Sequence, residues 1–189
     1  VLVFPKAAKE EQKLAAKEER FLIMATKNGL VKKIDAANFQ DVRRSGIVAI
    51  RLDKKDELKF VYLVSKGDQV ILVAKNGQSI MFKESNVRPT GRVAGGVKGI
   101  NLAAADELIG AGVIKDTKDH FILTMSKKGF GKKTSVKNYR VQKRSGTGIK
   151  TSKVTEKTGS LMVAKVVGPG FGEIIAISQK GQIIRVPLA

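Results

Sequence analysis

The sequence has 189 residues, and its 36 Lys and Arg outnumber its 17 Asp and Glu, which gives a formal net charge of +19. Hydrophobic residues make up 42% of the chain, so it can bury a core and is not a disordered basic tail. It has no cysteine, and its apolar runs are far shorter than the roughly 20 residues that cross a bilayer. These features argue against a disulfide-stabilised secreted domain and a helical membrane protein. We expect a cytoplasmic protein with an anionic partner.

In chain order, the first distinctive segment is 5–20, which consists largely of Lys, Glu and Ala and opens with Pro5. Ala, Lys and Glu are strong helix formers, and Pro is favoured at the first helical position. Lys6 and Glu10 also have the four-residue spacing of a helical ion pair. The segment therefore predicts a short helix inserted in a hairpin. Since Leu14 is its only large apolar anchor, we expect a solvated insertion more than a partner-binding helix.

The rest of the chain repeats one pattern, an apolar run with strand character, a turn, and a second run that often ends in basic residues. The copies occupy 21–33, 70–82, 121–133 and 174–185, and their turn glycines lie 48, 52 and 52 residues apart. Asn-Gly or Lys-Gly between two β-rich runs is typical of a two-residue hairpin turn, in which Gly supplies a positive φ. Each copy therefore predicts a β-hairpin, with turn glycines at Gly29, Gly77, Gly129 and Gly181.

Other features recur between the hairpins with the same period. A Gly followed by a branched apolar residue recurs at 46–47, 96–97 and 148–149, and further strand candidates lie at 58–64, 108–114 and 161–167, with 1–4 as a remnant. About four short strands in each unit of some 50 residues indicate an all-β architecture of blades repeated around an axis. We predict one domain over 1–189, containing about three and a half to four blades of a larger disc.

The sequence offers little catalytic chemistry. His120 is the only histidine, and it follows a polar turn, so neither a metal site nor an imidazole base is expected. Tyr62 and Tyr139 suit packed positions better than catalytic ones, and the glycine-rich segments 95–99 and 168–172 read as turns because neither opens a helix after a strand. We therefore predict no catalytic residue, no metal and no cofactor in this chain.

Basic turns recur at the same point of each unit, so in a radial array they would share one rim. A curved track of Arg and Lys suits contact with the phosphate backbone of bent duplex DNA more than reading of bases. The alternative is that these turns only maintain solubility, which would not require such an excess of one sign. The candidate DNA-binding residues are Arg43, Arg44, Arg51, Arg88, Arg92, Lys98, Arg140, Lys143 and Arg144 in the turns, with Lys32, Lys33, Lys132, Lys133 and Arg185 in the hairpins.

Four stretches of the sequence, 24–33, 45–52, 87–102 and 138–149, resemble the C-terminal domain of gyrase A, the A polypeptide of DNA gyrase, and its relative in topoisomerase IV. The resemblance implies a β-pinwheel of four-stranded blades that wraps double-stranded DNA around a basic rim. It also implies two partners, the rest of gyrase A and the gyrase B subunit, in an ATP-dependent topoisomerase whose cleavage tyrosine and ATP site lie elsewhere. The regular repeat favours gyrase over topoisomerase IV.

The same family carries a seven-residue box, Gln-Arg-Arg-Gly-Gly-Lys-Gly or a close variant. The nearest counterpart here is a degenerate copy in which Ser145 replaces a Gly and Thr147 replaces a base. The segment 43–46 resembles the box less closely. We therefore expect the intact box upstream of Val1. The box-like motif comprises Gln142, Lys143, Arg144, Ser145, Gly146, Thr147 and Gly148.

Two other function classes remain open at the level of sequence. An RNA-binding β protein would need exposed aromatic side chains to stack on bases, and most of the ten aromatic residues occupy apolar strand positions. A propeller-like protein-interaction scaffold would be expected to show a face of mixed charge. An anionic membrane is a weaker candidate, since no basic amphipathic helix with Trp or Phe is evident, and we predict no membrane partner.

Overall fold

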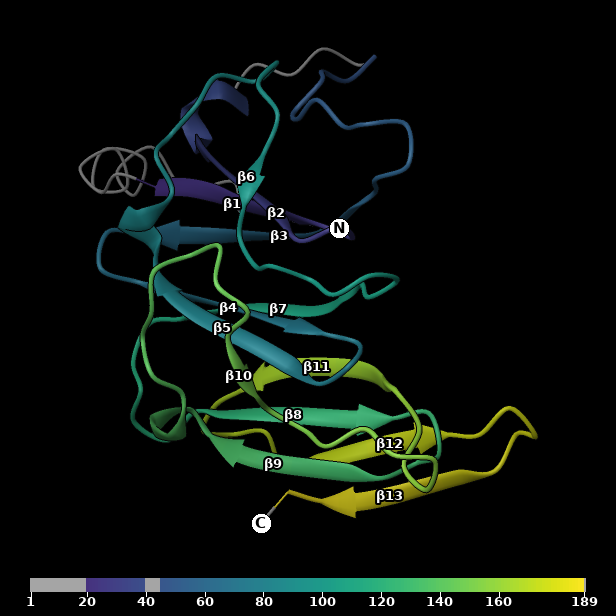
Figure 1. Ribbon diagram of the computed structural model, residues 1–189. Helices are drawn as coiled ribbons and strands as arrows, with labels where there is room; N and C mark the ends of the chain where they lie inside the picture. Colours follow the sequence, from purple (N-terminus) through teal and green to yellow (C-terminus); the bar gives the residue numbers. More distant parts are fainter. Residues whose placement is uncertain (1–19, 40–44, 189) are drawn as a thin grey trace.

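The structure, a computed structural model, describes residues 20–39 and 45–188 as a series of small antiparallel β-sheets (Figure 1). The helical insertion predicted for 5–20 lies outside the described residues, apart from Arg20, which begins β1. No helix of the described ranges is long and apolar enough to cross a membrane. The elements are β1 (Arg20–Thr26), β2 (Leu30–Asp35), the 3-10 turn η1 (Ala36–Phe39), β3 (Leu58–Ser65), β4 (Gln69–Ala74), β5 (Gln78–Lys83), η2 (Glu84–Asn86), β6 (Val97–Lys98), β7 (Leu108–Ile114), β8 (Phe121–Ser126), β9 (Gly131–Ser135), η3 (Val136–Asn138), β10 (Ile149–Lys150), β11 (Leu161–Val167), β12 (Glu173–Ile177) and β13 (Ile183–Pro187).

The four predicted hairpins are confirmed as the pairs β1–β2, β4–β5, β8–β9 and β12–β13. All four turn glycines have positive φ, between 78° and 89°, as the repeat predicts. The turns are longer than the two residues predicted: in the first, residues 27–29 connect the strands, and the Gly29 amide donates to the Thr26 carbonyl at 3.0 Å. The Thr26 hydroxyl also accepts from the Leu30 amide at 3.1 Å, which closes the loop a second time.

The sheets show that each four-stranded unit is assembled from two successive repeats. The first sheet has the strand order β3-β1-β2-β6 and the second β7-β4-β5-β10, while the described strands of the third are β11-β8-β9 and of the fourth β12-β13. Strands β6 and β10 follow the second and third hairpins in the chain, yet they pair with the first and second hairpins through β2 and β5. The prediction of four strands per unit is therefore correct in number, but the fourth strand of a sheet comes from the following repeat.

The core lies between successive sheets, because the central strands are covered on both faces. Along β4, Val70 and Leu72 belong to a core cluster shared with the first sheet, whereas Ile71 and Val73 belong to one shared with the third. Alternate side chains of a strand point to opposite faces, so a strand buried on both sides is continuously apolar. This explains why the apolar runs of the hairpins do not alternate with polar residues.

Two repeat positions can be compared at the successive interfaces between sheets, namely the residue four positions after a turn glycine and the residue seven positions after the next one. At the first interface they form the ion pair of Lys33 with Glu84, and at the second Met81 and Val136 occupy one core cluster. At the third interface the Lys133 ammonium donates to the Leu188 carbonyl at 2.7 Å. Equivalent backbone positions therefore accept an ion pair, an apolar pair or a hydrogen bond.

Candidate nucleic-acid interface

The candidate interface consists of three connections, 45–52, 88–98 and 140–150, which we call the basic belt. Together they hold eight Arg and Lys and no Asp or Glu. The second and third connections end in β6 and β10, so each becomes an edge strand of the preceding sheet, beside β2 or β5. The belt bases are Arg51, Arg88, Arg92, Lys98, Arg140, Lys143, Arg144 and Lys150.

The three connections of the belt are joined to one another in series. The Arg51 amide donates to the Ala94 carbonyl at 3.2 Å, which joins the first connection to the second. The Ser145 amide donates to the Gly99 carbonyl at 2.7 Å, and the Asn101 amide donates to the Gly146 carbonyl at 2.8 Å, so the end of the second connection holds the third. These backbone contacts place basic segments that are about 50 residues apart in the sequence side by side.

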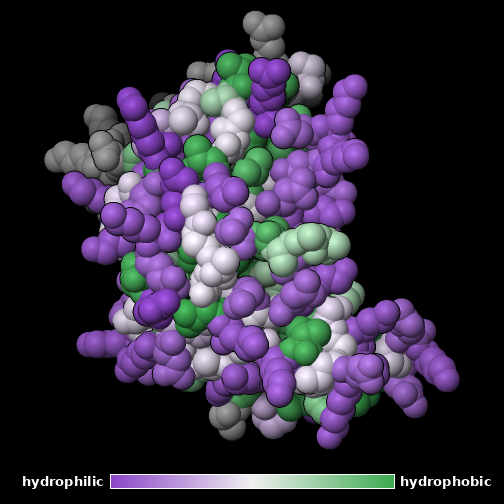
Figure 2. Space-filling model, viewed as in Figure 1, coloured by the Kyte–Doolittle hydropathy of each residue, from purple (hydrophilic) through white to green (hydrophobic). Residues whose placement is uncertain are grey.

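The belt bases other than Arg144 are available to an external anion. Seven of the eight are exposed and Arg144 is half-buried. Within the described part of the chain, none of the eight lies in an ion pair. Figure 2 shows one face of the molecule, on which hydrophilic side chains predominate and hydrophobic patches lie between them. The belt is therefore a strip of uncompensated positive charge.

Outside the belt, the loops that precede β3 and β7 hold acidic residues that pair with lysines. Glu57 lies 2.7 Å from the Lys59 ammonium and 3.5 Å from that of Lys27, and Glu107 lies 2.8 Å from that of Lys75. Hydrogen bonding to Lys59 lowers the pKa of Glu57, and hydrogen bonding to Lys75 lowers that of Glu107. Positive charge is thus neutralised beside the hairpin turns and left uncompensated in the belt.

Two candidate DNA-binding residues are buried, which corrects the expectation that the hairpin lysines reach the surface. Lys32 is 1% exposed and Lys33 is 5% exposed. They are neighbours in β2, so their side chains point to opposite faces of the first sheet. Lys33 forms the ion pair with Glu84 and lies 4.7 Å from the centre of the Phe21 ring. Neither ammonium is available to a phosphate. Arg43 and Arg44 lie outside the described residues.

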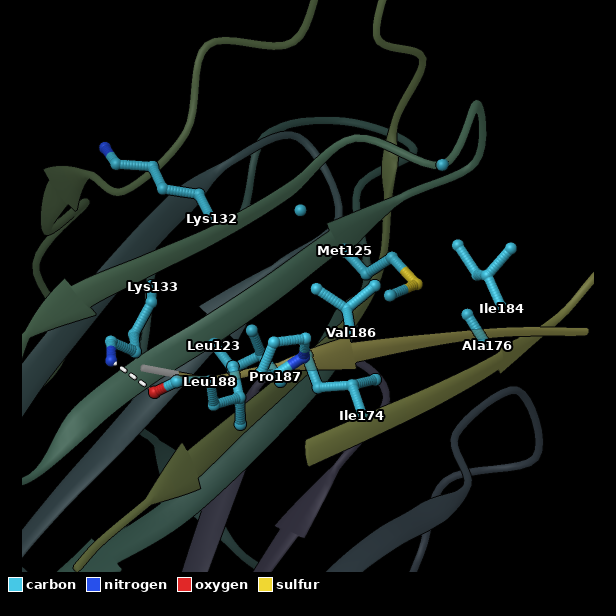
Figure 3. A pocket seen from close by; sticks show the side chains of 12 residues that line it. Leu123, Met125, Lys132, Lys133, Ile174, Ala176, Ile184, Val186, Pro187 and Leu188 are labelled. Atoms are coloured by element: carbon cyan, nitrogen blue, oxygen red, sulfur yellow. Dashed lines mark hydrogen bonds between the residues drawn. The ribbon is translucent and has the colours of Figure 1, made fainter. Parts of the chain in front are cut away.

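The later hairpin bases are exposed. Lys132 and Lys133 are the counterparts of Lys32 and Lys33 in the third hairpin. Figure 3 shows Lys133 directed toward the Leu188 carbonyl, while Lys132 extends away from the fourth hairpin. Lys133 also lies 4.7 Å from the centre of the Phe121 ring, and Arg185 pairs with Glu173 across its own hairpin. Lys132 is therefore the hairpin base that is best placed to meet an external phosphate.

A cavity of about 320 Å³ lies between the third and fourth hairpins (Figure 3). Its lining is mainly apolar, with Leu123 and Met125 from β8 facing Ile174, Ile184 and Val186 from the fourth hairpin. Among the described residues, no histidine or acidic side chain lines it. Across the described ranges, no group of three His, Asp or Glu side chains could hold a metal ion. The cavity therefore offers mainly apolar packing surface, with Lys132 and Lys133 as its charged lining residues.

The box-like motif forms the part of the belt where the second and third connections meet. The Arg144 guanidinium donates to the carbonyls of Asn86 and Lys98, both at 3.0 Å. The Ser145 hydroxyl donates to the same Lys98 carbonyl at 2.9 Å. Lys143 and Thr147 are exposed. The motif therefore has a structural half, which binds backbone, and an exposed half, which can meet a ligand. This division was not apparent from the sequence.

Backbone conformation explains two of the small residues of the motif. Ser145 has a φ of 73° and Gly148 a φ of 78°, both in the left-handed region that favours glycine. The family's box has Gly where this chain has Ser145, which is consistent with that conformation. A β-carbon on Gly148 would overlap the carbonyl oxygen of Ser79 on β5. Gly148 therefore permits β10 to approach the second sheet.

We expect Gly148→Ala to destabilise the protein by about 3 kcal/mol, because it combines an unfavourable φ with a backbone overlap. Ser145→Gly is the matched control, since it relieves a positive φ while removing two hydrogen bonds of the hydroxyl, one donated to the Lys98 carbonyl and one accepted from the Arg144 guanidinium, and we expect a change within about 1 kcal/mol. Urea unfolding followed by circular dichroism measures both. Similar stabilities for the two variants would contradict the close approach of β10 described here.

The fold and the belt together define a class, a β-propeller-like protein built of repeated sheets with a basic rim. Comparison with known proteins then identifies the family. The family model described as "DNA gyrase C-terminal domain, beta-propeller" matches residues 20–65, 68–115, 120–167 and 172–189. The chain belongs to this family.

Individual relatives agree with the assignment. The chain is 37% identical over 172 residues to the gyrase A polypeptide of Staphylococcus aureus strains MRSA252 and NCTC 8325, covering 91% of this chain and 19% of those proteins. A solved DNA gyrase A C-terminal domain matches with a TM-score of 0.75 at 26% identity, over 89% of this chain and 56% of that one. The C-terminal domain of DNA topoisomerase IV matches with a TM-score of 0.82 over 91% of this chain and 53% of that one. Its 24% identity shows the fold alone.

Proposed function

We propose that this chain binds duplex DNA without regard to base sequence and bends it along the basic belt, as part of a gyrase A polypeptide. The observation that carries the proposal is the composition of the belt, which has eight bases, no acid and no ion pair within the described residues. Duplex DNA presents one phosphate charge per roughly 1.7 Å of axis, so a strip of positive charge can follow its backbone.

The position of the aromatic side chains favours duplex DNA over single-stranded nucleic acid. Phe130 and Phe171 are the exposed phenylalanines of the described ranges, and neither belongs to the belt. A lysine ammonium lies over each ring, Lys157 at 5.9 Å and Lys165 at 5.3 Å from the ring centres. The belt therefore lacks the stacking platform that single-stranded binding uses.

Within this proposal, the chain contributes about three and a half to four blades of a larger pinwheel. It spans about one fifth of the length of the gyrase A polypeptides that it matches. Its partners are then the remainder of gyrase A and the gyrase B subunit, which between them hold the strand-passage chemistry. DNA held by this chain would be bent for use by the rest of that complex.

We expect the affinity for a random duplex to fall steeply with salt and to be almost the same for duplexes of different sequence. Each phosphate that the belt neutralises adds about −0.9 to the slope of log affinity against log salt. Fluorescence anisotropy with labelled duplexes of about 40 base pairs, titrated from low to moderate salt, gives this slope. A flat salt dependence, or a strong preference for one sequence, would refute contact through the phosphate backbone.

A further inference from the structure

Lys32 is a buried lysine with an unusual set of partners. Its ammonium donates hydrogen bonds to three backbone carbonyls, those of Ala49 at 2.8 Å, Arg92 at 2.6 Å and Ala94 at 2.8 Å. An ammonium has three donors, so its hydrogen-bonding capacity is filled by backbone alone. No carboxylate pairs with it within the described ranges. Burial lowers the pKa of Lys32.

The repeat shows that the sheet itself does not require a lysine at this position. Its counterpart in the second hairpin is Ile80, which is fully buried in the core. Its counterpart in the third is Lys132, which is exposed and makes one long hydrogen bond, 3.4 Å, to the Thr151 carbonyl. An apolar side chain therefore satisfies the same strand position one repeat later. What distinguishes Lys32 is the set of carbonyls that surrounds it.

Those carbonyls come from two different connections of the belt. Ala49 belongs to the connection 45–52, which carries Arg51, whereas Arg92 and Ala94 belong to the connection 88–98. The tight turn around Arg92 is closed by the Ala94 amide, which donates to the Gly91 carbonyl at 3.2 Å. One buried ammonium thus binds the inner side of two segments whose exposed side chains carry the positive charge.

We infer that Lys32 is a positioning residue for DNA binding, which fixes Arg51 and the Arg92 turn relative to each other without touching DNA. The inference rests on the proposed function of the belt. The ammonium acts like a bound cation in a cage of carbonyl oxygens, and it orders the backbone from which the phosphate-binding side chains extend. A pre-ordered backbone lowers the entropic cost of aligning those side chains with successive phosphates.

The first test uses Lys32→Met, which keeps the bulk of the stem and removes the three donors. In the free protein we expect amide hydrogen exchange in 49–52 and 90–96 to rise by about tenfold or more, since three carbonyls lose their partner. Lys132→Met is the matched control, because it removes a lysine from the same repeat position, and we expect no change in those two segments. Unchanged exchange in Lys32→Met would overturn the inference that Lys32 holds the two connections.

The second test separates positioning from direct contact with DNA. Lys32→Met should weaken binding to a 40-base-pair duplex and reduce its bending, measured by end-to-end fluorescence transfer, while the salt slope stays within about 0.3 of the wild-type value. Lys132→Met should instead flatten the slope by up to about 0.9 if that lysine meets a phosphate. A flattened slope in Lys32→Met would show direct contact and overturn the inference.

A double-mutant cycle with Arg92→Ala completes the argument. If Lys32 acts through the Arg92 turn, the affinity loss of the double variant will be clearly smaller than the product of the two single losses. Independent, multiplicative losses would contradict the inference. If the wild-type chain itself failed to bind DNA with a steep salt dependence, the proposed function would fall. The exchange experiment on free protein would still decide whether Lys32 holds the two connections.

A measurement on wild-type protein covers the case in which Lys32→Met does not fold. The Lys32 ammonium, held by three carbonyls, should exchange its protons slowly enough for detection by nitrogen NMR of lysine side chains. On addition of duplex, its signal should keep its position while signals of exposed lysines move. A Lys32 signal that moves as much as the exposed ones would overturn the inference.

Discussion

Replacing Lys33 by Met is expected to lower the free energy of unfolding by about 3–5 kcal/mol, because it leaves the Glu84 carboxylate buried without its cation. The two side chains are 6% and 4% exposed. The Gly67 amide donates to Glu84 at 3.4 Å, which is a weak replacement for a charged partner. For a protein of this size such a loss lowers Tm by roughly 10 °C. Glu84→Val should lower the free energy of unfolding by a similar amount, since it leaves the buried Lys33 ammonium without its carboxylate partner.

The double variant Lys33→Met, Glu84→Val should recover most of this loss, because it gives this interface the buried residue types that the next interface has at the same repeat positions. Met81 and Val136 occupy the same positions relative to their turn glycines, and Val136 begins η3 as Glu84 begins η2. A buried ion pair can often be replaced by apolar residues at little cost. Chemical denaturation of the four proteins gives the coupling free energy. A double variant as unstable as the worse single variant would contradict this equivalence of the two interfaces.

Local sequence patterns were sufficient to predict the hairpins. The turn glycines Gly29, Gly77, Gly129 and Gly181 mark where the chain reverses, and strand-like runs flank each of them. Both signals act over a few residues. The turn length was predicted less well, since the connections have three to five residues, and the first, third and fourth turns are closed by an amide-to-hydroxyl bond such as that from the Leu30 amide to the Thr26 hydroxyl. Such bonds depend on geometry that the residue types alone do not specify.

The pairing of β6 and β10 with the preceding repeat could not be predicted from local pattern. Val97–Lys98 and Ile149–Lys150 are two residues long, so they have no measurable periodicity. Their partners, β2 and β5, lie in the preceding repeat, and the pairing depends on how the connections fold back. The close approach of Gly148 to Ser79 is the local requirement for one such pairing, and it becomes evident only once both segments are placed.

The burial of Lys32 and Lys33 was mispredicted because two adjacent lysines usually mark a surface. The repeat contained the contrary signal. The aligned residues in the second hairpin are Ile80 and Met81, both apolar and both buried, so the position itself is internal. Reading the basic residues against their counterparts, and not by charge alone, would have separated the structural lysines from the exposed bases of the belt.

Reversing three exposed belt charges together, Arg88→Glu, Arg92→Glu and Lys143→Glu, is expected to reduce duplex affinity by about a thousandfold or more near 0.1 M salt. Each lost phosphate contact forfeits about one released counterion, which is close to tenfold at that concentration, and the new carboxylates add repulsion. The salt slope should also flatten by about 2.7, or 0.9 for each contact. Single changes of these residues to Ala should cost about tenfold or less, to a similar extent on every sequence.

The matched control reverses three exposed lysines in loops next to the outer strands β3 and β7, Lys55→Glu, Lys66→Glu and Lys118→Glu. Three reversals remove six charges, so both triple variants have a formal charge of +13 instead of +19. If overall charge alone attracted the DNA, the two variants would bind equally weakly. We expect the control to stay within about tenfold of wild type and to keep its salt slope, because charges outside the belt are screened over about 10 Å at 0.1 M salt. Equal losses in the two variants would show that DNA responds to net charge, and that the belt is not the binding track.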